Sequence, residues 1–304
     1  MSNPSNKKLL LIVNPRSGKG GYKDCLAQVE YEIQQHGYVT TLVFTDCHGS
    51  ATEIAAEHAA EYDRIVCMGG DGTLAETVTG LMRLPKADRV PLGYIPMGTT
   101  NDSASTFGIS KNPVLAARTA VCGKPVPIDI GKSSSGYFTY VCAFGAFTEV
   151  SYETPQDTKN ALGKLAYFLE ALTRLPNLTH RRCRVEFDGG VVEGDYIFAS
   201  VTNAYTVAGV LHLPDSIVSL QDGVFEVMLI RRPENVLDLG PTLSDIVTNN
   251  FTSEYVTMLH SKRVKFITAE PVAWTADGEG AGTHSIMTCE NIPGAIEMMI
   301  NIRE

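Results

Sequence analysis

The sequence has 304 residues and a net charge of −9, with 44% hydrophobic and 19% charged residues. This length allows two domains of ordinary size, and this composition is typical of a folded protein and excludes a disordered chain. A negatively charged chain lacks the positive field that non-specific nucleic-acid binding requires, so we expect no nucleic-acid partner.

Cysteine and histidine usage argues against a disulfide framework and against a zinc centre. The seven cysteines stand singly with no Cys-x-x-Cys pair, and the seven histidines form no His-Glu-x-x-His motif. Such cysteines are typical of free thiols in a reducing compartment, which predicts a cytoplasmic protein. No apolar run in the sequence reaches the roughly 18 residues of a membrane-spanning helix, so we expect any membrane contact to be peripheral.

Strand and helix patterns alternate through residues 1–128. Continuous apolar strands between amphipathic helices predict an α/β domain with a parallel sheet covered on both faces, and ligands of such sheets bind at the carboxyl ends of the strands. The expected strands are 9–13, 39–44, 64–68 and 92–95, and the expected helices are 23–36, 52–61, 74–84 and 114–122.

The pattern changes after residue 128. Short strand-like runs separated by Gly, Asp and Ser predict a mainly antiparallel β-sandwich or barrel over residues 129–292. The last apolar run, 295–302, is expected to return to the first domain, which therefore comprises 1–128 and 293–304. The expected strands of the second domain are 137–143, 184–187, 196–202, 224–230, 264–268 and 271–275, with helices over 161–174 and 236–248.

The most informative motif is Gly69-Gly70-Asp71-Gly72-Thr73, placed between an apolar strand and a helix. Glycines at a helix start leave backbone N–H groups open to a phosphate, and the helix dipole favours an anion there. A carboxylate in such a place indicates phosphate chemistry assisted by a metal ion. The structural alternative is a tight turn in which Asp71 or Thr73 caps its own helix.

Two further glycine-rich loops follow predicted strands. Asn14–Gly21 combines glycines, a serine and two cations, which suits a nucleotide phosphate, although it matches no P-loop. Pro96–Asp102 would lie at the same sheet edge as Asp71 and could otherwise cap a short helix. Two Asp-Gly motifs, Asp222-Gly223 and Asp277-Gly278-Glu279, occur later in the sequence. Each of them in isolation predicts a hairpin turn.

Two segments of the second half suit a lipid surface as well as a structural role. Apolar residues of 159–174 recur at helical spacing, which favours a core face or a helix that lines a lipid entry. The basic stretch His180–Arg184 could meet anionic headgroups or form a short charged turn.

Taken in order, these motifs resemble the diacylglycerol kinase catalytic family, in particular its soluble bacterial lipid kinases. The likeness runs from about Lys8 to the C-terminus, and five motifs in the right order make it specific. Two positions depart from the family pattern: Ala75 replaces a frequent asparagine, and Asp215 replaces a small residue after Leu213-Pro214. Ala75 removes one polar contact, which could change nucleotide affinity.

The resemblance implies an ATP-dependent lipid kinase with two domains. The first would be similar to phosphofructokinases and NAD kinases, the second would be a β-sandwich, and ATP would bind between them. The acceptor would be a lipid hydroxyl, most simply that of diacylglycerol, at a membrane surface, and a homodimer is also expected. An NAD kinase-like enzyme and a catalytically silent nucleotide- or lipid-binding module are the alternatives.

The resemblance also implies roles for individual residues. Asp71 with Mg²⁺ would organise the phosphates, and Glu279 would be the base that accepts the proton of the lipid hydroxyl. Asp222 would hold a second, structural Mg²⁺ with the carbonyl groups of Ser219 and Val224, and Asp102 and Asp129 match further acidic positions. The expected ATP contacts are Asn14, Pro15, Arg16, Ser17, Gly18, Thr45, Gly70, Asp71, Gly72, Thr73, Leu74, Ala75, Glu76 and Thr99.

Overall fold

A computed structural model describes most of the chain. The described residues are 7–99, 101–145, 180–207, 211–214, 217–232, 238, 241–242, 244–245, 248, 250–251 and 253–301. The helix predicted over 161–174 lies outside the described residues, as do Thr100, Asp215 and much of the helix predicted over 236–248. Within the described part of the chain, no helix is both long and apolar enough to cross a membrane.

The chain divides into two compact units. Residues 1–130 and 293–304 form the first unit, and residues 131–292 form the second. The second unit is therefore inserted into the sequence of the first.

The sheet of the first unit is built from four apolar strands and the end of a fifth, in the order β15-β4-β3-β1-β2. Its neighbouring strands run parallel, and Met298 near the end of β15 pairs in parallel with Leu92 of β4. Leu9 to Val13 are at most 1% exposed, because this strand carries apolar side chains on both faces. The strands are β1 (Lys7–Val13), β2 (Tyr38–Phe44), β3 (Arg64–Gly69), β4 (Leu92–Pro96) and β15 (Glu279–Ile300).

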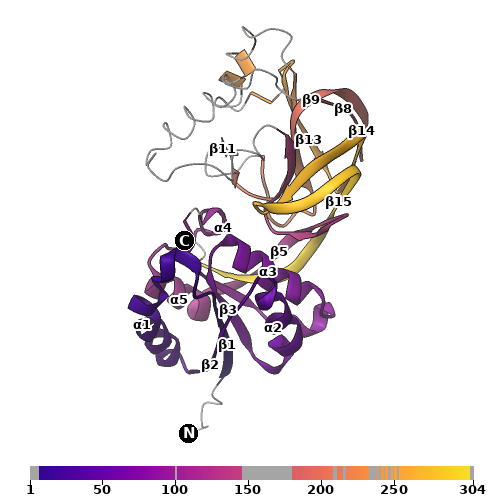
Figure 1. Cartoon of the computed structure of the whole chain (residues 1–304). Coiled ribbons are helices and arrows are strands. Elements are labelled where there is room, and N and C mark those ends of the chain that lie inside the picture. The colour runs from indigo at the N-terminus through magenta and orange to yellow at the C-terminus, as the bar shows by residue number, and fades with distance from the viewer. Residues whose placement is uncertain are drawn as a thin grey trace. The chain divides into compact units, whose positions relative to one another are not determined.

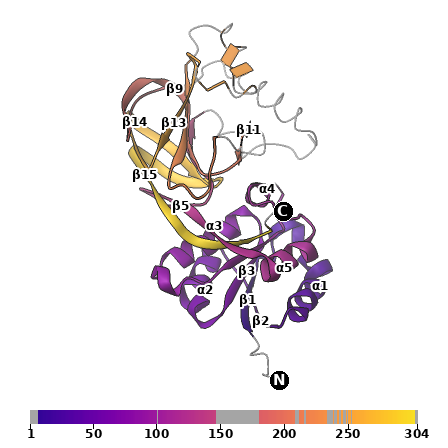
Figure 2. The same ribbon diagram turned by 180° about the vertical axis from the view of Figure 1, so that it is seen from behind.

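Helices cover both faces of this sheet, with α1 and α5 on one side and α2 and α3 on the other (Figures 1 and 2). Helix α5 begins where Asn112 accepts the N–H groups of Val114 and Leu115. Gly80 lets α3 pack closely on α2, because a Cβ there would collide with the carbonyl of Thr52. The helices are α1 (Tyr22–Gln35), α2 (Ser50–His58), α3 (Asp71–Met82), α4 (Asp102–Thr106) and α5 (Pro113–Cys122), with short 3₁₀ turns at Ser17–Gly20, Ala59–Glu61 and Lys86–Asp88.

The second unit is a curved antiparallel sheet around an aromatic core. Its strand order is β13-β12-β9-β7-β14-β15, and β8 pairs with both β9 and β14. The rings of Phe144 and Phe266 both contact Trp274 at 4.8–5.2 Å between centroids inside this core. Strand β5 (Lys124–Ser133) begins in the first unit and ends in the second. The other strands are β6 (Gly136–Phe138), β7 (Val141–Gly145), β8 (Arg181–Phe187), β9 (Gly190–Thr202), β10 (Thr206–Val207), β11 (Leu211–His212), β12 (Phe225–Arg231), β13 (Val256–Ser261) and β14 (Arg263–Ala276).

Several predicted elements of the second half differ from the observed ones. The strand predicted over 137–143 is two strands, β6 and β7, because the backbone between them turns to bind Asp277. The runs 264–268 and 271–275 are one strand, β14, whose register against β15 shifts between Ile267 and Val272. The basic stretch is not a turn, since strand β8 begins at Arg181.

Candidate active site

Three loops meet at the carboxyl edge of the first unit's sheet. They follow β1, β3 and β4, and backbone and side-chain hydrogen bonds tie them together. Gly70 N–H donates to Ser17 Oγ at 3.2 Å, and Asn14 Nδ2 donates to Thr73 Oγ1 at 2.9 Å. Met97 N–H donates to Gly69 O at 2.7 Å. The loops singled out in the sequence therefore form one continuous surface of backbone groups.

Glycines allow this close approach of loops. Gly18 has φ +58°, and a Cβ there would collide with the carbonyl oxygen of Met97. A Cβ on Gly98 would lie 2.9 Å from the Cα of Gly70. The loops after β1, β3 and β4 therefore need glycine to pack against one another.

Gly18→Ala should both weaken the fold and disturb this surface. Left-handed backbone strain and the clash with Met97 together should cost about 2–4 kcal/mol of unfolding free energy. Gly37→Ala is the matched control, because Gly37 has φ +80° and a Cβ added there would meet no atom within 4 Å, so only strain of about 1 kcal/mol is expected. Urea unfolding of both variants and the KM for ATP of each measure these effects. An equal loss of unfolding free energy in the two variants would contradict the packing role of Gly18.

Asp71 lies in the first turn of α3, but it does not cap that helix. The N-cap is Gly70, which makes no side-chain cap hydrogen bond. Both carboxylate oxygens of Asp71 instead accept backbone N–H groups from the start of α4, from Asp102 and Ser103, at 3.1 Å each. The interpretation of Asp71 or Thr73 as a local cap is wrong. Asp71 joins the loop after β3 to the loop after β4, and a carboxylate keeps further lone pairs for a ligand.

Asn101 shapes this edge, although the sequence motif assigned it no role of its own. It is buried with φ 55°, and its side chain receives Gly98 N–H at 2.9 Å and donates to Gly98 O at 2.8 Å. The signal in the sequence was the αL tolerance of asparagine close to a glycine. Asn101 thereby fixes the turn that presents the exposed Thr99.

The remaining predicted ATP contacts are placed as follows. Thr45 is buried directly after β2, where its N–H donates to Val13 O at 2.9 Å. Glu76 lies one turn into α3 and accepts the N–H groups of Gly49 at 2.8 Å and Ala51 at 3.2 Å, so it holds the start of α2. Pro15 and Arg16 lie in the loop after β1, and Gly72 lies in the first turn of α3. Leu74 is buried in α3, and Ala75 is half-buried beside it.

In the second unit, Asp277 and Gly278 form the two-residue turn between β14 and β15. Their φ values of 49° and 85° are those of a left-handed hairpin turn. The buried Asp277 carboxylate accepts four hydrogen bonds, from Thr139 N–H at 2.6 Å and Oγ1 at 2.8 Å, Tyr140 N–H at 3.0 Å and Val141 N–H at 3.1 Å. Burial raises the pKa of Asp277, and these four donors oppose that shift. The turn is thereby anchored, and Glu279 begins β15 with its side chain exposed.

Asp277→Asn should loosen this hairpin. An amide NH₂ would face N–H donors, so about 2–4 kcal/mol of stability should be lost, together with some activity through Glu279. Asp188→Asn is the control, since Asp188 is an aspartate of the β8–β9 turn whose carboxylate accepts Lys262 N–H at 2.7 Å. Thermal unfolding compares the melting temperatures of the two variants. An unchanged melting temperature in Asp277→Asn would contradict the anchoring role of Asp277.

A further turn with an acidic residue, Asp222-Gly223, leads into β12. Asp222 is exposed, its Oδ1 accepts Val224 N–H at 3.0 Å, and Gly223 has φ 74°. Glu226 follows on β12 and is fully buried, and neither of its carboxylate oxygens has a hydrogen-bond partner within the described residues. Burial, with a smaller contribution from the charge of Asp222, raises the pKa of Glu226 to about 8. Hard oxygen donors beside an uncompensated buried carboxyl fit a divalent cation such as Mg²⁺.

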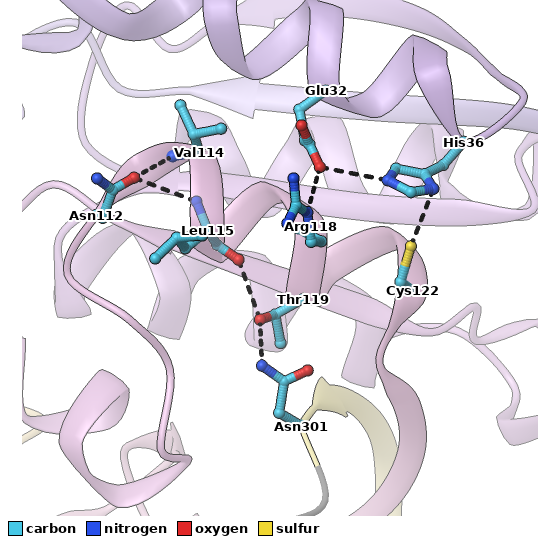
Figure 3. Close-up of polar contacts among 9 residues, drawn as sticks. All are labelled: Glu32, His36, Asn112, Val114, Leu115, Arg118, Thr119, Cys122 and Asn301. Atoms are coloured by element: carbon cyan, nitrogen blue, oxygen red, sulfur yellow. Dashed lines mark hydrogen bonds and ion pairs between the residues drawn. The ribbon is translucent and has the colours of Figure 1, made fainter.

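A pocket of 520 Å³ is lined by residues of α4, of α5 and of the segment between them, among them Ser105, Ile109 and Leu115. At its edge, Cys122 Sγ lies 3.1 Å from His36 Nδ1, and Arg118 Nε donates to Glu32 Oε1 at 2.6 Å (Figure 3). Burial raises the pKa of the Cys122 thiol, and the charge of Glu32 raises it further. These contacts join α1 to α5.

Comparison with known proteins places the chain in a family. The model of the diacylglycerol kinase catalytic domain matches residues 8–133, and that of the YegS C-terminal NAD kinase beta sandwich-like domain matches residues 143–300. A diacylglycerol kinase from Bacillus subtilis is 37% identical over 279 residues, which is 91% of each chain. The chain belongs to the diacylglycerol kinase family. It is a lipid kinase, a phosphotransferase with an alcohol acceptor.

Other members of the diacylglycerol kinase family show the same extent of likeness. A diacylglycerol kinase from Staphylococcus carnosus is 32% identical over 281 residues, covering 91% of this chain and 90% of its own. The crystal structure of a proposed diacylglycerol kinase from Bacillus anthracis superposes with a TM-score of 0.82 at 27% identity, covering 99% and 97% of the two chains. The predicted two-domain architecture with a β-sandwich second domain is thereby confirmed.

Proposed function

We propose that this kinase transfers the γ-phosphoryl group of ATP to a hydroxyl group of diacylglycerol. The observation that supports this most strongly is the family match over nearly the whole chain. The acceptor is a lipid, so the enzyme works at a membrane surface by peripheral contact, and it acts as a homodimer.

The joined loops of the first unit are the proposed phosphate-binding surface. Residues 14–18, Gly70, the backbone N–H groups of 71–73 at the start of α3 and the exposed Thr99 would contact ATP, with Thr45 and residues 74–76 supporting the loops. Asp71 is held by two backbone N–H groups, so its carboxylate has a fixed position before any ligand arrives. Such a preorganised carboxylate suits Mg²⁺ and the phosphates that Mg²⁺ neutralises.

Glu279 is the proposed general base. An alcohol is a weak nucleophile, and a carboxylate that accepts its proton makes attack on phosphorus easier. The exposed position of Glu279 leaves it open to a substrate, while the anchored turn before it limits its movement. Both properties support its assignment as the base.

Asp222, with the carbonyl groups of Ser219 and Val224, would hold the second Mg²⁺. When bound there, the ion would supply positive charge that orders the turn before β12. The exposed Asp222 carboxylate and the buried, unpartnered Glu226 carboxyl support such a site.

A substrate panel tests this function. Purified protein is given radiolabelled ATP, Mg²⁺ and micelles that contain diacylglycerol, phosphatidylglycerol or sphingosine, with NAD as a water-soluble acceptor. Phosphorylated diacylglycerol is the expected product. Phosphorylation of NAD alone would favour an NAD kinase, and ATP binding without any phosphorylated product would favour a silent binding module.

A further inference from the structure

Glu226 is a buried acidic residue for which the fold alone gives no reason. It is 0% exposed, and both carboxylate oxygens are without a hydrogen-bond partner among the residues that the structure describes. Its backbone register places it between Thr202 of β9 and His260 of β13. A buried polar group without a partner costs free energy, so a native protein usually supplies one.

The direction of its side chain follows from the alternation of β12. Phe225 and Val227 pack in the aromatic core on one face of the strand. Glu226 therefore faces the other side, which it shares with Met228. Met228 packs there in a cluster with Leu213 and Val218.

Two members of that cluster, Leu213 and Val218, come from the segment that carries the Asp222 turn. Val218 immediately precedes Ser219, and Asp222, Gly223 and Val224 lead directly into β12. The unpartnered carboxyl of Glu226 therefore lies on the face of the sheet that this segment covers. A divalent cation at the turn would be the partner that the described residues do not provide.

We propose that Glu226 is a second anionic group of the divalent-cation site at the Asp222 turn. This inference rests on the proposed function, which assigns Mg²⁺ to that turn, and it adds a residue on β12 to the site. An exposed carboxylate with carbonyl oxygens makes a weak site, whereas a second carboxylate raises its affinity for a hard cation. Glu226 acts either as a ligand or through a bound water, and in both cases it fixes the metal against the sheet.

The alternative is a neutral glutamic acid that is simply buried. Glutamine has the same shape and no charge, so it should be tolerated equally under that alternative. The two possibilities therefore differ in metal affinity, and a binding measurement separates them.

The experiment measures Mn²⁺ binding by electron paramagnetic resonance, without nucleotide or lipid, in wild type, Glu226→Gln, Asp222→Asn and Glu254→Gln. Glu254 is an exposed glutamate of the same unit and serves as the control. Wild type and Glu254→Gln should bind Mn²⁺ equally, and Glu226→Gln and Asp222→Asn should each bind it about tenfold more weakly or worse. The rise in melting temperature on adding Mg²⁺ should shrink in Glu226→Gln in parallel.

Equal Mn²⁺ affinity in wild type and Glu226→Gln would overturn the proposal, as would a wild type that binds no Mn²⁺ without nucleotide. If the glutamine variant does not fold by circular dichroism, Glu226→Asp keeps the carboxylate but withdraws it by one methylene, and weaker Mn²⁺ binding is again expected. None of these measurements uses ATP turnover. A failed lipid assay beside a metal defect in Glu226→Gln would therefore refute the proposed function and leave this inference standing.

Discussion

Glu279→Gln should remove lipid phosphorylation while ATP binding persists. Glutamine keeps the size and the exposed position of the side chain but cannot accept the proton of the lipid hydroxyl. General-base catalysis contributes about 10²–10⁴-fold, so kcat should fall by that factor, with the KM for ATP nearly unchanged. Steady-state kinetics on micellar diacylglycerol, with ATP affinity measured by calorimetry, checks both halves of this result.

Glu290→Gln is the matched control for Glu279→Gln. Glu290 is another exposed glutamate of β15, opposite Arg263 of β14. The Glu290→Gln variant should keep wild-type turnover, because the substitution only removes a surface charge that contributes little free energy. Normal turnover in Glu279→Gln would show that the base is a different group.

Asp71→Asn should damage both the fold and the reaction. One of the two N–H groups from Asp102 and Ser103 would face an amide NH₂ and lose its acceptor, which should cost about 1–3 kcal/mol of unfolding free energy. The loss of the carboxylate from the proposed phosphate surface should also lower kcat/KM for ATP by about 10²-fold or more. Urea unfolding and ATP-dependent kinetics measure the two effects separately.

Asp24→Asn controls for the removal of a negative charge near a helix start. Asp24 lies in the first turn of α1 and is exposed. Its replacement should cost about 0.3–1 kcal/mol through the helix dipole and leave kinetics unchanged. If Asp71→Asn behaved like Asp24→Asn, Asp71 would be a helix-start residue without a part in the reaction.

Sequence reasoning located the first unit's elements and its three loops because local signals encode them. Apolar runs ended by glycine or proline marked β1, β3 and β4, and the carboxyl-edge rule placed their loops together. The partner of Asp71 could not be predicted, because the N–H groups that it receives come from Asp102 and Ser103, about thirty residues later in the chain. Non-local hydrogen bonds of this kind leave no pattern in one sequence.

In the second unit, several features could not be predicted because the local sequence signals for them are weak. Strand β15 begins with Glu279-Gly280-Ala281-Gly282, a sequence that favours a turn over a strand, so its first half was missed. The D-G dipeptide correctly predicted the hairpin, but its deep anchorage by Thr139 to Val141 depends on distant backbone. The sequence analysis assigned no role to Glu226, which lies within the apolar run of β12. A single acidic residue at a buried strand position was the signal that could have identified it.

The insertion of residues 131–292 between two parts of one unit has a consequence for biosynthesis. Strand β4 receives its outer parallel neighbour from residues near Met298, which the ribosome delivers only after the whole inserted unit. Non-local parallel pairing is intrinsically slow, and transiently unpaired strand edges promote aggregation. The edge of β4 therefore stays open during translation, and nascent chains stalled before residue 293 should depend on chaperones to remain in solution.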